Sequence, residues 1–223
     1  MAAPLFEFRD NVAPVAPRRV YPAFGKRLLD LTLLTLMIPV VLPLIAAILF
    51  VTALGGGRAL YSQIRVGRDG RLFRCWKVRT MIPDADAALA RILRDDRALA
   101  EEWRKTQKLA RDPRVTRFGA LLRRTSLDEL PQLWNVLNGT MSLVGPRPFT
   151  PEQRELYRNG RADADYYRLR PGLTGLWQVS RRNRGSFGER SAYDSVYRTH
   201  MSLWTDLSIL ARTVIVVLRA TGV

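Results

Sequence analysis

Two adjacent carboxylates, Asp128 and Glu129, are the residues of this chain whose types and spacing most suggest chemistry. They lie in the stretch 126–137, where an amphipathic helix is predicted to begin. The rigid segment 145–148 follows them, and basic residues precede them: Arg111, Arg114, Arg117, Arg123 and Arg124. A carboxylate among cations can attack a bound phosphorus atom or hold Mg²⁺ beside substrate phosphates. The pattern therefore suits a reaction on a phosphorylated, metal-bound substrate.

A structural role is the alternative for the same pair of carboxylates. Ser126 and Glu129 match a capping box, in which Glu129 would accept a hydrogen bond from the Ser126 backbone N–H. Pro131 complicates this register, because proline favours the first helical turn and would start the helix itself. In either register Asp128 lies near a helix N-terminus, whose dipole favours the ionised carboxylate. Locally, capping and catalysis both stay open.

Basic residues elsewhere in the chain are candidate phosphate ligands. Lys77 and Arg79 are expected to leave a predicted hairpin on alternate faces, so that only one of them points at a given site; a solvated surface charge is the alternative for either. Arg147 stands between two prolines, and a rigid guanidinium suits bidentate phosphate recognition; a structural proline turn is the alternative. The cluster 181–184 would face phosphate, nucleotide or lipid headgroups, and a generic membrane-facing patch is equally consistent with it.

The composition indicates an anionic partner. Among 223 residues, 36 Lys and Arg against 20 Asp and Glu give a formal net charge of +16. Nucleic acid, a phosphorylated substrate or an acidic membrane surface would satisfy this balance. One cysteine, Cys75, and one histidine, His200, argue against a disulfide framework and a Cys/His zinc site. We expect Cys75 in the core and His200 partly buried.

A long apolar stretch, residues 28–54, must place these residues relative to a membrane. It exceeds the ~20 residues that cross a bilayer as a helix. Basic residues flank both of its ends, which predicts that both ends stay on the cytoplasmic side. Pro39 and Pro43 lie in its middle and favour a bend. We therefore predict a re-entrant helix–break–helix over residues 21–57, with an ordinary kinked span as the alternative.

The remaining chain predicts a mainly α fold with a small β-hairpin, of the α+β class. Residues 1–20 indicate a flexible arm, residues 58–200 a cytoplasmic catalytic domain, and residues 201–223 an interfacial C-terminal helix within it. Asp69-Gly70 predicts the hairpin turn. Apolar spacing and loop residues give the other elements: helices over 84–110, 118–124, 131–137 and 150–169, and loops over 171–175 and 181–185.

Motifs across most of the chain resemble those of the bacterial sugar transferases, the monotopic phosphoglycosyl transferases. The motifs, in this order, are KVRTM (77–81), SLDELPQL (126–133), SLVGPRP (142–148), RPGLTGLWQV (170–179) and RN (182–183). The resemblance runs from about Lys26 to the C-terminus. The short N-terminus and residues 101–104 are most similar to small exopolysaccharide-initiating members that transfer galactose-1-phosphate.

The resemblance implies an activity and roles for particular residues. Such enzymes move a sugar-1-phosphate from a UDP-sugar to a polyprenyl phosphate such as undecaprenyl phosphate, release UMP, use Mg²⁺ and follow a ping-pong route. Asp128 would be the nucleophile and a metal ligand, and Glu129 would support the nucleophile or the metal. The other motif positions would bind phosphate and nucleotide: Lys77, Arg79, Arg123, Pro146, Arg147, Arg182 and Asn183.

The same resemblance implies a place in the cell and partners. The catalytic domain would lie on the cytoplasmic face of the inner membrane, among its phospholipids, and no nucleic acid is expected. A second copy of the chain and downstream glycosyltransferases are the protein partners considered. Two departures stand out: Leu42 precedes Pro43 where the family has serine, and Arg181 stands where it often has glycine. The sugar and the polymer are not specified by these motifs.

Two other classes of protein are compatible with parts of the sequence. A membrane-tethered protein that binds nucleic acid or anionic lipid would account for the positive charge, and its binding would not depend on Asp128. A scaffold of a polysaccharide assembly complex would keep the fold without turnover. The intact acidic pair favours the enzyme over the scaffold.

Overall fold

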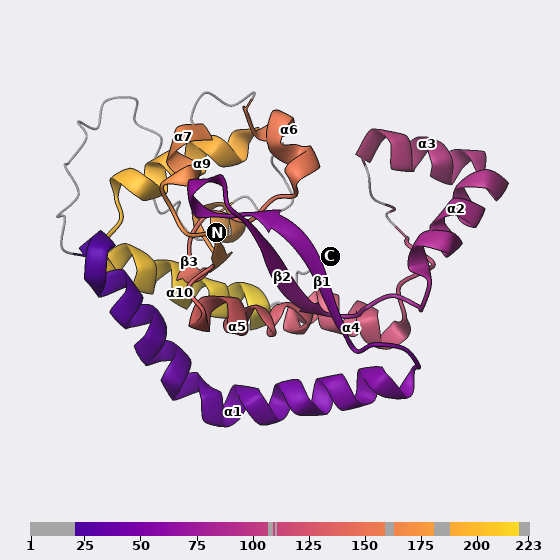
Figure 1. The fold of residues 1–223 in the computed structure, drawn as a ribbon, viewed down its shortest axis with the longest axis horizontal. Coiled ribbons are helices and arrows are strands. Elements are labelled where there is room, and N and C mark those ends of the chain that lie inside the picture. Colours follow the sequence, from indigo (N-terminus) through magenta and orange to yellow (C-terminus); the bar gives the residue numbers. More distant parts are fainter. Residues whose placement is uncertain (1–20, 107–108, 110, 159–162, 181–187, 219–223) are drawn as a thin grey trace.

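A computed structural model describes residues 21–106, 109, 111–158, 163–180 and 188–218, which form an α+β fold as predicted (Figure 1). The strands are β1 (Leu60–Val66), β2 (Leu72–Val78), β3 (Ser142–Val144) and β4 (Gly172–Thr174). The helices are α1 (Lys26–Leu54), α2 (Ala85–Asp95), α3 (Arg97–Thr106), α4 (Arg117–Thr125), α5 (Gln132–Leu137), α6 (Arg154–Arg158), α7 (Asp163–Tyr167), α8 (Leu176–Ser180), α9 (Glu189–Thr199) and α10 (Leu203–Leu218).

The antiparallel hairpin β1–β2 is the larger sheet among the described residues. Its turn lies where the sequence predicts it: Asp69 and Gly70 adopt φ of 58° and 74°, which aspartate tolerates and glycine favours. The strand register pairs Gln63 with Cys75 and Arg65 with Phe73. Directly opposed residues share a face of a sheet, so these side chains lie on the same face as Lys77.

The long apolar segment forms one continuous helix, α1, rather than the predicted helix–break–helix. Pro39 and Pro43 lie inside the helix, where each lacks the N–H that would bond one turn back. The helix bends about halfway along its length (Figure 1), as prolines allow. Within the described residues, Tyr21–Leu54 is the one helical stretch long and apolar enough to cross a membrane by length and composition, and most of it is exposed.

The start of α1 is joined to the rest of the fold by a buried ion pair. Lys26 Nζ lies 2.6 Å from Asp206 Oδ2 of α10, and their side chains are only 10% and 1% exposed. The Tyr197 hydroxyl accepts a hydrogen bond from Lys26 at 2.7 Å and donates one to Asp206 at 2.7 Å. Tyr21 donates a further bond to Asp206 at 2.6 Å. Charge and hydrogen-bonding capacity are thus satisfied together, as burial requires.

Two further residues of the first turns of α1 contact segments that lead to the acidic pair. Arg27 donates hydrogen bonds to the last carbonyls of α5, those of Val136 and Leu137, at 2.6 and 2.8 Å. Asp30 accepts bonds from the Ser142 hydroxyl and the Leu143 N–H of β3, both at 3.0 Å. The N-terminal part of α1 is therefore fixed against both α5 and β3.

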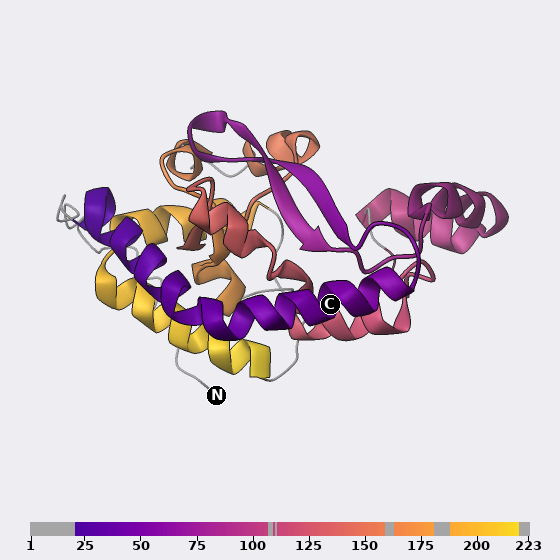
Figure 2. The same cartoon turned by 60° about the horizontal axis from the view of Figure 1, so that its bottom comes forward.

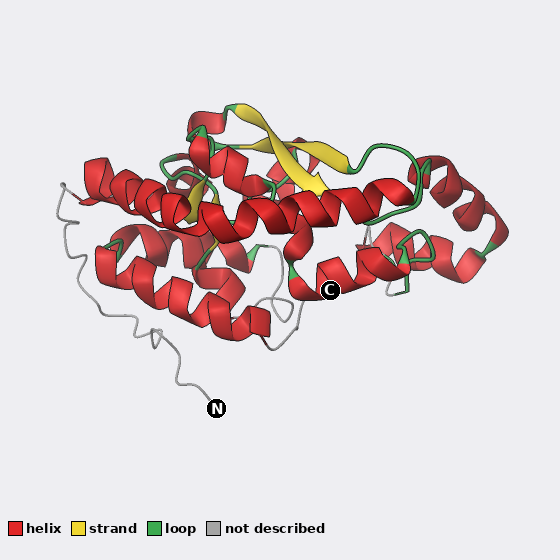
Figure 3. Ribbon diagram, turned by 90° about the horizontal axis from the view of Figure 1, so that it is seen from below, coloured by secondary structure: helices red, strands yellow, loops and turns green. Residues whose placement is uncertain are grey.

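The far end of α1 contacts the same body of the protein. Arg79 Nη2 donates a hydrogen bond to the Thr52 carbonyl at 3.0 Å, and Ile48 packs with Val78 and Leu122 in a small buried cluster. Helices α1, α4 and α10 lie on one side of the molecule (Figures 2 and 3). Exposed apolar side chains on these helices include Leu36, Val40, Leu42, Phe50, Leu121, Trp204, Val214 and Ile215.

Glycines allow β3 and β4 to run side by side as a parallel pair. A Cβ on Gly172 would stand 2.1 Å from the Gly145 nitrogen, and one on Gly145 would stand 2.3 Å from the Arg170 carbonyl oxygen. Gly172 N–H also donates a bond to the Pro146 carbonyl at 2.8 Å. This close approach of two backbones holds the segment that carries Arg147. The predicted loop 171–175 thus contains strand β4.

The predicted helix over 84–110 is two helices. Asp96 separates α2 from α3 with extended backbone angles, and its side chain accepts bonds from the N–H groups of Ala98 and Leu99. An aspartate in this position starts a new helix by satisfying its free N–H groups. Together α2 and α3 project from the body of the protein (Figure 1). The short helices expected near 118–124 and 131–137 are confirmed as α4 and α5.

Candidate active site

The acidic pair lies in a single 3₁₀ turn, Leu127–Glu129, between α4 and α5. Ser126 ends α4 in the left-handed conformation, with φ of 60°, and this reverses the chain. Pro131 then immediately precedes α5, without a side-chain capping hydrogen bond. The capping-box interpretation is wrong: Ser126 makes no side-chain cap of the turn, and Glu129 is bonded to cations instead.

Glu129 joins the two basic residues that flank it in space. Lys77 Nζ lies 2.8 Å from its Oε1 and Arg147 Nη2 lies 3.1 Å from the same atom. Burial raises the pKa of Glu129, but the charges of Arg147 and Lys77 outweigh it and hold this pKa well below its usual range. Glu129 is therefore ionised and serves as the anchor that positions two cations.

Asp128 is more buried, at 8% exposure, and is held less tightly. Its Oδ2 lies 4.0 Å from Lys77 Nζ. Burial raises the pKa of Asp128 and the Glu129 charge adds to this, while Lys77, Arg123 and Arg147 oppose it; the net shift is upward. The sequence predicted that the helix dipole would favour the ionised form of Asp128, but burial has the larger effect on its pKa. A carboxylate that is desolvated beside a cation is poised to react with an electrophile.

The Lys77 and Arg79 side chains point in different directions, as expected, but the reason is not that they lie on alternate faces of a strand. Residues two apart on a strand share a face. Instead β2 ends at Val78, so Lys77 points at the acidic pair while Arg79 turns to the C-terminal end of α1. Arg79 donates to the Thr52 carbonyl in the last turn of α1, and its predicted phosphate contact stays a prediction.

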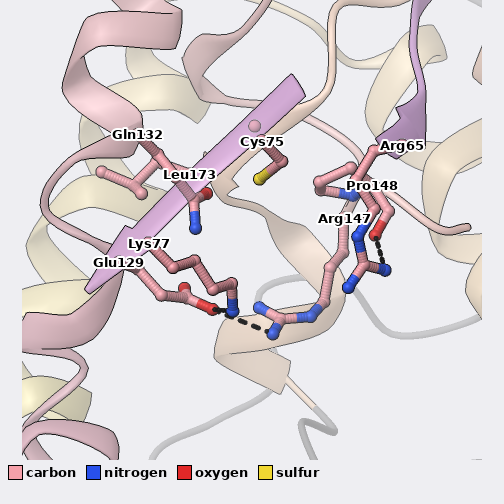
Figure 4. A pocket seen from close by; sticks show the side chains of 9 residues that line it. Arg65, Cys75, Lys77, Glu129, Gln132, Arg147, Pro148 and Leu173 are labelled. Atoms are coloured by element: carbon pink, nitrogen blue, oxygen red, sulfur yellow. Dashed lines mark hydrogen bonds and ion pairs between the residues drawn. The ribbon is translucent and has the colours of Figure 1, made fainter. Parts of the chain in front are cut away.

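A pocket opens beside Glu129, as Figure 4 shows. It is lined by Arg65, Cys75, Lys77, Glu129, Gln132, Arg147, Pro148, Gly172 and Leu173. Lys77, Glu129 and Arg147 were predicted from their motifs. Arg65 was not among the predicted site residues. The available signal was the hairpin register, which places Arg65 on the same face of the sheet as Cys75 and Lys77.

Comparison with known proteins decides the family. A family model described as "Bacterial sugar transferase" matches residues 21–220. The chain belongs to this family. A UDP-galactose-lipid carrier transferase of Erwinia amylovora is 46% identical over 89% of this chain and 41% of its own length. An undecaprenyl-phosphate galactose phosphotransferase of Salmonella typhimurium is 42% identical over 98% and 44%, respectively.

Relatives of this sugar transferase differ in length. The chain spans less than half the length of the two relatives just described. An exopolysaccharide production protein ExoY of Sinorhizobium fredii is 43% identical over 89% of this chain and 87% of its own length. Each of the three matches covers at least 89% of this sugar transferase.

Other predicted residues lie around or outside the site of this sugar transferase. Arg123 donates a hydrogen bond to the Thr80 hydroxyl at 2.9 Å, and its charge acts on Asp128. Pro146 accepts the Gly172 N–H and so supports the turn that carries Arg147. Arg182 and Asn183 lie outside the described residues, as does Arg181. Cys75 is buried, as expected, and His200 is partly buried.

Acidic side chains near the pocket bear on the predicted Mg²⁺. Among the described residues there is no group of three or more His, Cys, Asp or Glu that could hold a metal ion. Mg²⁺ commonly uses one or two carboxylates and completes its shell with water and substrate phosphates. Asp128 fits this pattern better than Glu129, because Lys77 and Arg147 already occupy Glu129 Oε1.

Proposed function

We propose that this sugar transferase moves a sugar-1-phosphate from a UDP-sugar to undecaprenyl phosphate and releases UMP. The observation that carries the proposal is the desolvated Asp128 carboxylate in a chain of this family: it lies 4.0 Å from Lys77, and Lys77 lines a basic pocket together with Glu129. Relatives include an undecaprenyl-phosphate galactose phosphotransferase and a UDP-glucose:undecaprenyl-phosphate glucose-1-phosphate transferase of Escherichia coli. Galactose and glucose phosphates are therefore the first donors to test.

The first half-reaction forms a covalent intermediate on Asp128. A carboxylate oxygen of Asp128 bonds to the sugar-bearing phosphorus, and the bond from that phosphorus to the bridging oxygen breaks. UMP leaves with the electron pair of that bond, so no net proton transfer is needed. Lys77 and Arg147 stand beside the reacting phosphate and stabilise the charge that shifts onto the leaving oxygen.

The second half-reaction restores the enzyme. An oxygen of the lipid phosphate bonds to the phosphorus on Asp128, and the bond from phosphorus to the aspartyl oxygen breaks. The products are a polyprenyl diphosphosugar and a free carboxylate. Glu129 is not consumed in either step; it holds Lys77 and Arg147 in place through two short ion pairs. Positioning of this kind contributes most when the catalyst acts by charge.

Mg²⁺ is the cofactor that we propose for this site. Asp128 would hold it together with phosphate oxygens of the donor, and the ion would neutralise charge on the diphosphate. The chain itself supplies Lys77 and Arg147 for the remaining charge. Removal of divalent ions with a chelator should abolish turnover, and Mg²⁺ added back should restore it.

We also propose that α1 enters one leaflet of the bacterial inner membrane and returns, with the catalytic domain on the cytoplasmic face. Both ends of α1 contact the same body of the protein, through Lys26 at one end and Arg79 at the other. A helix that crossed the bilayer would separate these ends by the membrane thickness. The exposed Trp204 on α10, 77% exposed, suits the headgroup region.

Topology can be tested with single introduced cysteines. The natural Cys75 is the one cysteine of the chain and is buried, so it adds little background labelling. Cysteines at Phe24 and Arg58, which flank α1, should both react with an impermeant maleimide from the cytoplasmic side of oriented vesicles. Reaction from opposite sides would rule out the re-entrant arrangement.

The activity is tested with the full chain in nanodiscs. A panel of UDP-sugars is supplied with undecaprenyl phosphate and Mg²⁺, and UMP release is measured. Asp128→Asn should lose turnover, and donor alone should add the mass of one phosphosugar to the wild-type chain. Asp69→Asn, at the exposed hairpin turn, is the matched control and should behave as wild type. Absence of UMP with every donor would contradict the proposal.

The wider partners follow from the reaction. The product is a lipid-linked sugar, so a glycosyltransferase that extends a lipid-linked chain must act next. We propose that this chain starts the synthesis of an exopolysaccharide or another glycoconjugate, as the name of the ExoY relative suggests. A second copy of the chain is a further proposed partner, and analytical ultracentrifugation in detergent tests it.

A further inference from the structure

One cation of the pocket has no part in the mechanism described so far. Arg65 lies on β1, on the hairpin face that also carries Cys75 and Lys77, because Gln63 pairs with Cys75 and Tyr61 with Lys77. Lys77 stands at the end of this face nearest the acidic pair. Arg65 lies at the other end of the pocket, on the same face of the hairpin, beyond the Gln63–Cys75 pair.

Arg65 is held by neutral groups and not by a carboxylate. Its Nη1 donates to the Pro148 carbonyl at 3.3 Å and its Nη2 donates to Gln63 Oε1 at 2.6 Å. A guanidinium has five N–H donors, so three make no hydrogen bond to the part of the chain that the structure describes. Among the described residues, no ion pair to Arg65 is formed.

The charge of Arg65 is poorly compensated where it lies. Burial lowers the pKa of this guanidinium, and the nearby charge of Arg147 lowers it further, although Glu129 opposes this. Two guanidinium groups near each other cost free energy unless an anion lies between them. In Figure 4 the Arg147 side chain lies between the Glu129–Lys77 pair and Arg65. The row of cations thus extends beyond the two carboxylates that pair with Lys77 and Arg147.

We propose that Arg65 and Arg147 form a subsite for a phosphate monoester on the leaving-group side of the reacting phosphorus. This inference rests on the proposed function. In an in-line displacement the leaving oxygen departs from the side opposite the nucleophile. With Asp128 at one end of the cationic row, the departing phosphate of UMP falls toward Arg65 at the other end.

The same geometry applies to the second step. The lipid phosphate must approach the phosphorus on Asp128 from the side that UMP has left. The Arg65 subsite is therefore occupied in turn by two phosphate monoesters, first the nucleotide and then the lipid. UMP and undecaprenyl phosphate should consequently compete for it.

The test compares UMP with uridine, which lacks the phosphate. Binding of each to the full chain in nanodiscs is measured by calorimetry for wild type, Arg65→Gln and Arg65→Lys. Arg65→Gln should weaken UMP about ten- to a hundredfold, as expected for the loss of charge-assisted hydrogen bonds, and should leave uridine unchanged. Arg65→Lys should recover part of the loss, because it keeps the charge without the planar fork. The KM for undecaprenyl phosphate should rise in Arg65→Gln as well.

Arg68→Gln is the matched control, because Arg68 lies on the same hairpin but is exposed, at 51%, and paired with Asp69. It should bind UMP as wild type does. Unchanged UMP affinity in Arg65→Gln, or equal losses for UMP and uridine, would overturn the subsite. A rise only in the KM for the lipid would also overturn it as stated. Failure of the proposed function looks different: wild type itself would then bind no UMP and release none from any donor.

Discussion

Substitution of Lys26 by methionine should destabilise the fold far more than the loss of a surface charge would. Lys26 and Asp206 are 10% and 1% exposed and lie 2.6 Å apart. Without Lys26, the Asp206 carboxylate stays buried with the Tyr21 and Tyr197 hydroxyls as hydrogen-bond donors, and these neutral groups do not compensate its charge. Breaking such a buried pair costs about 3–5 kcal/mol. For a chain of this size, that corresponds to a fall in Tm of about 6–20 °C.

The assay is thermal unfolding in detergent, with intrinsic fluorescence as the signal. The double variant Lys26→Met with Asp206→Asn removes both charges and should recover a large part of the loss, because no uncompensated charge then remains buried. Arg68→Met breaks an exposed pair and should cost less than about 1 kcal/mol. If the double variant were as unstable as the sum of its single variants, the ion pair would not be coupled and the reasoning would be refuted.

Three further predictions follow from the site and the packing around it. Lys77→Met should move the acid limb of the pH–rate profile of UMP release to higher pH, because Lys77 lowers the pKa of Asp128 and the reactive form of Asp128 is ionised. Lys77→Arg should restore the position of this limb. A limb that does not move in Lys77→Met would show that another group titrates there. Gly172→Ala should lower the unfolding free energy by about 3 kcal/mol or more, measured by urea denaturation, because its Cβ would stand 2.1 Å from a backbone nitrogen. Arg79→Gln should lower Tm through the lost cap on α1 and leave the KM for the donor unchanged; a raised KM would return Arg79 to the donor site.

Elements with strong local signals were predicted well. The Asp69-Gly70 turn and the helices near 118–124 and 131–137 are encoded by residues that act on their own neighbours. The division of 84–110 into two helices was not predicted, although aspartate is a favoured N-cap residue and Asp96 could have indicated the start of a second helix. Strands β3 and β4 were beyond local reasoning, since three-residue strands depend on a partner distant in the sequence.

The site was only partly predictable for the same reason. The acidic pair and Arg147 come from motifs, and the structure brings them together with Lys77. The role of Glu129 as an anchor depends on Lys77, 52 positions away, so local sequence left the capping box open as an interpretation, and it is wrong. Arg79 looked equivalent to Lys77, yet the end of β2 sends the two side chains in different directions.

The attachment of α1 at both ends has a consequence for how the protein would respond to its bilayer. A helix joined to one body by Lys26 at its start and by Arg79 at its end cannot tilt independently of that body. In a thicker or thinner bilayer, a free helix would adjust its angle. Here α1 and the rest of the protein would move relative to the bilayer as one rigid body. The distance from Asp128 to the apolar helix would therefore stay constant.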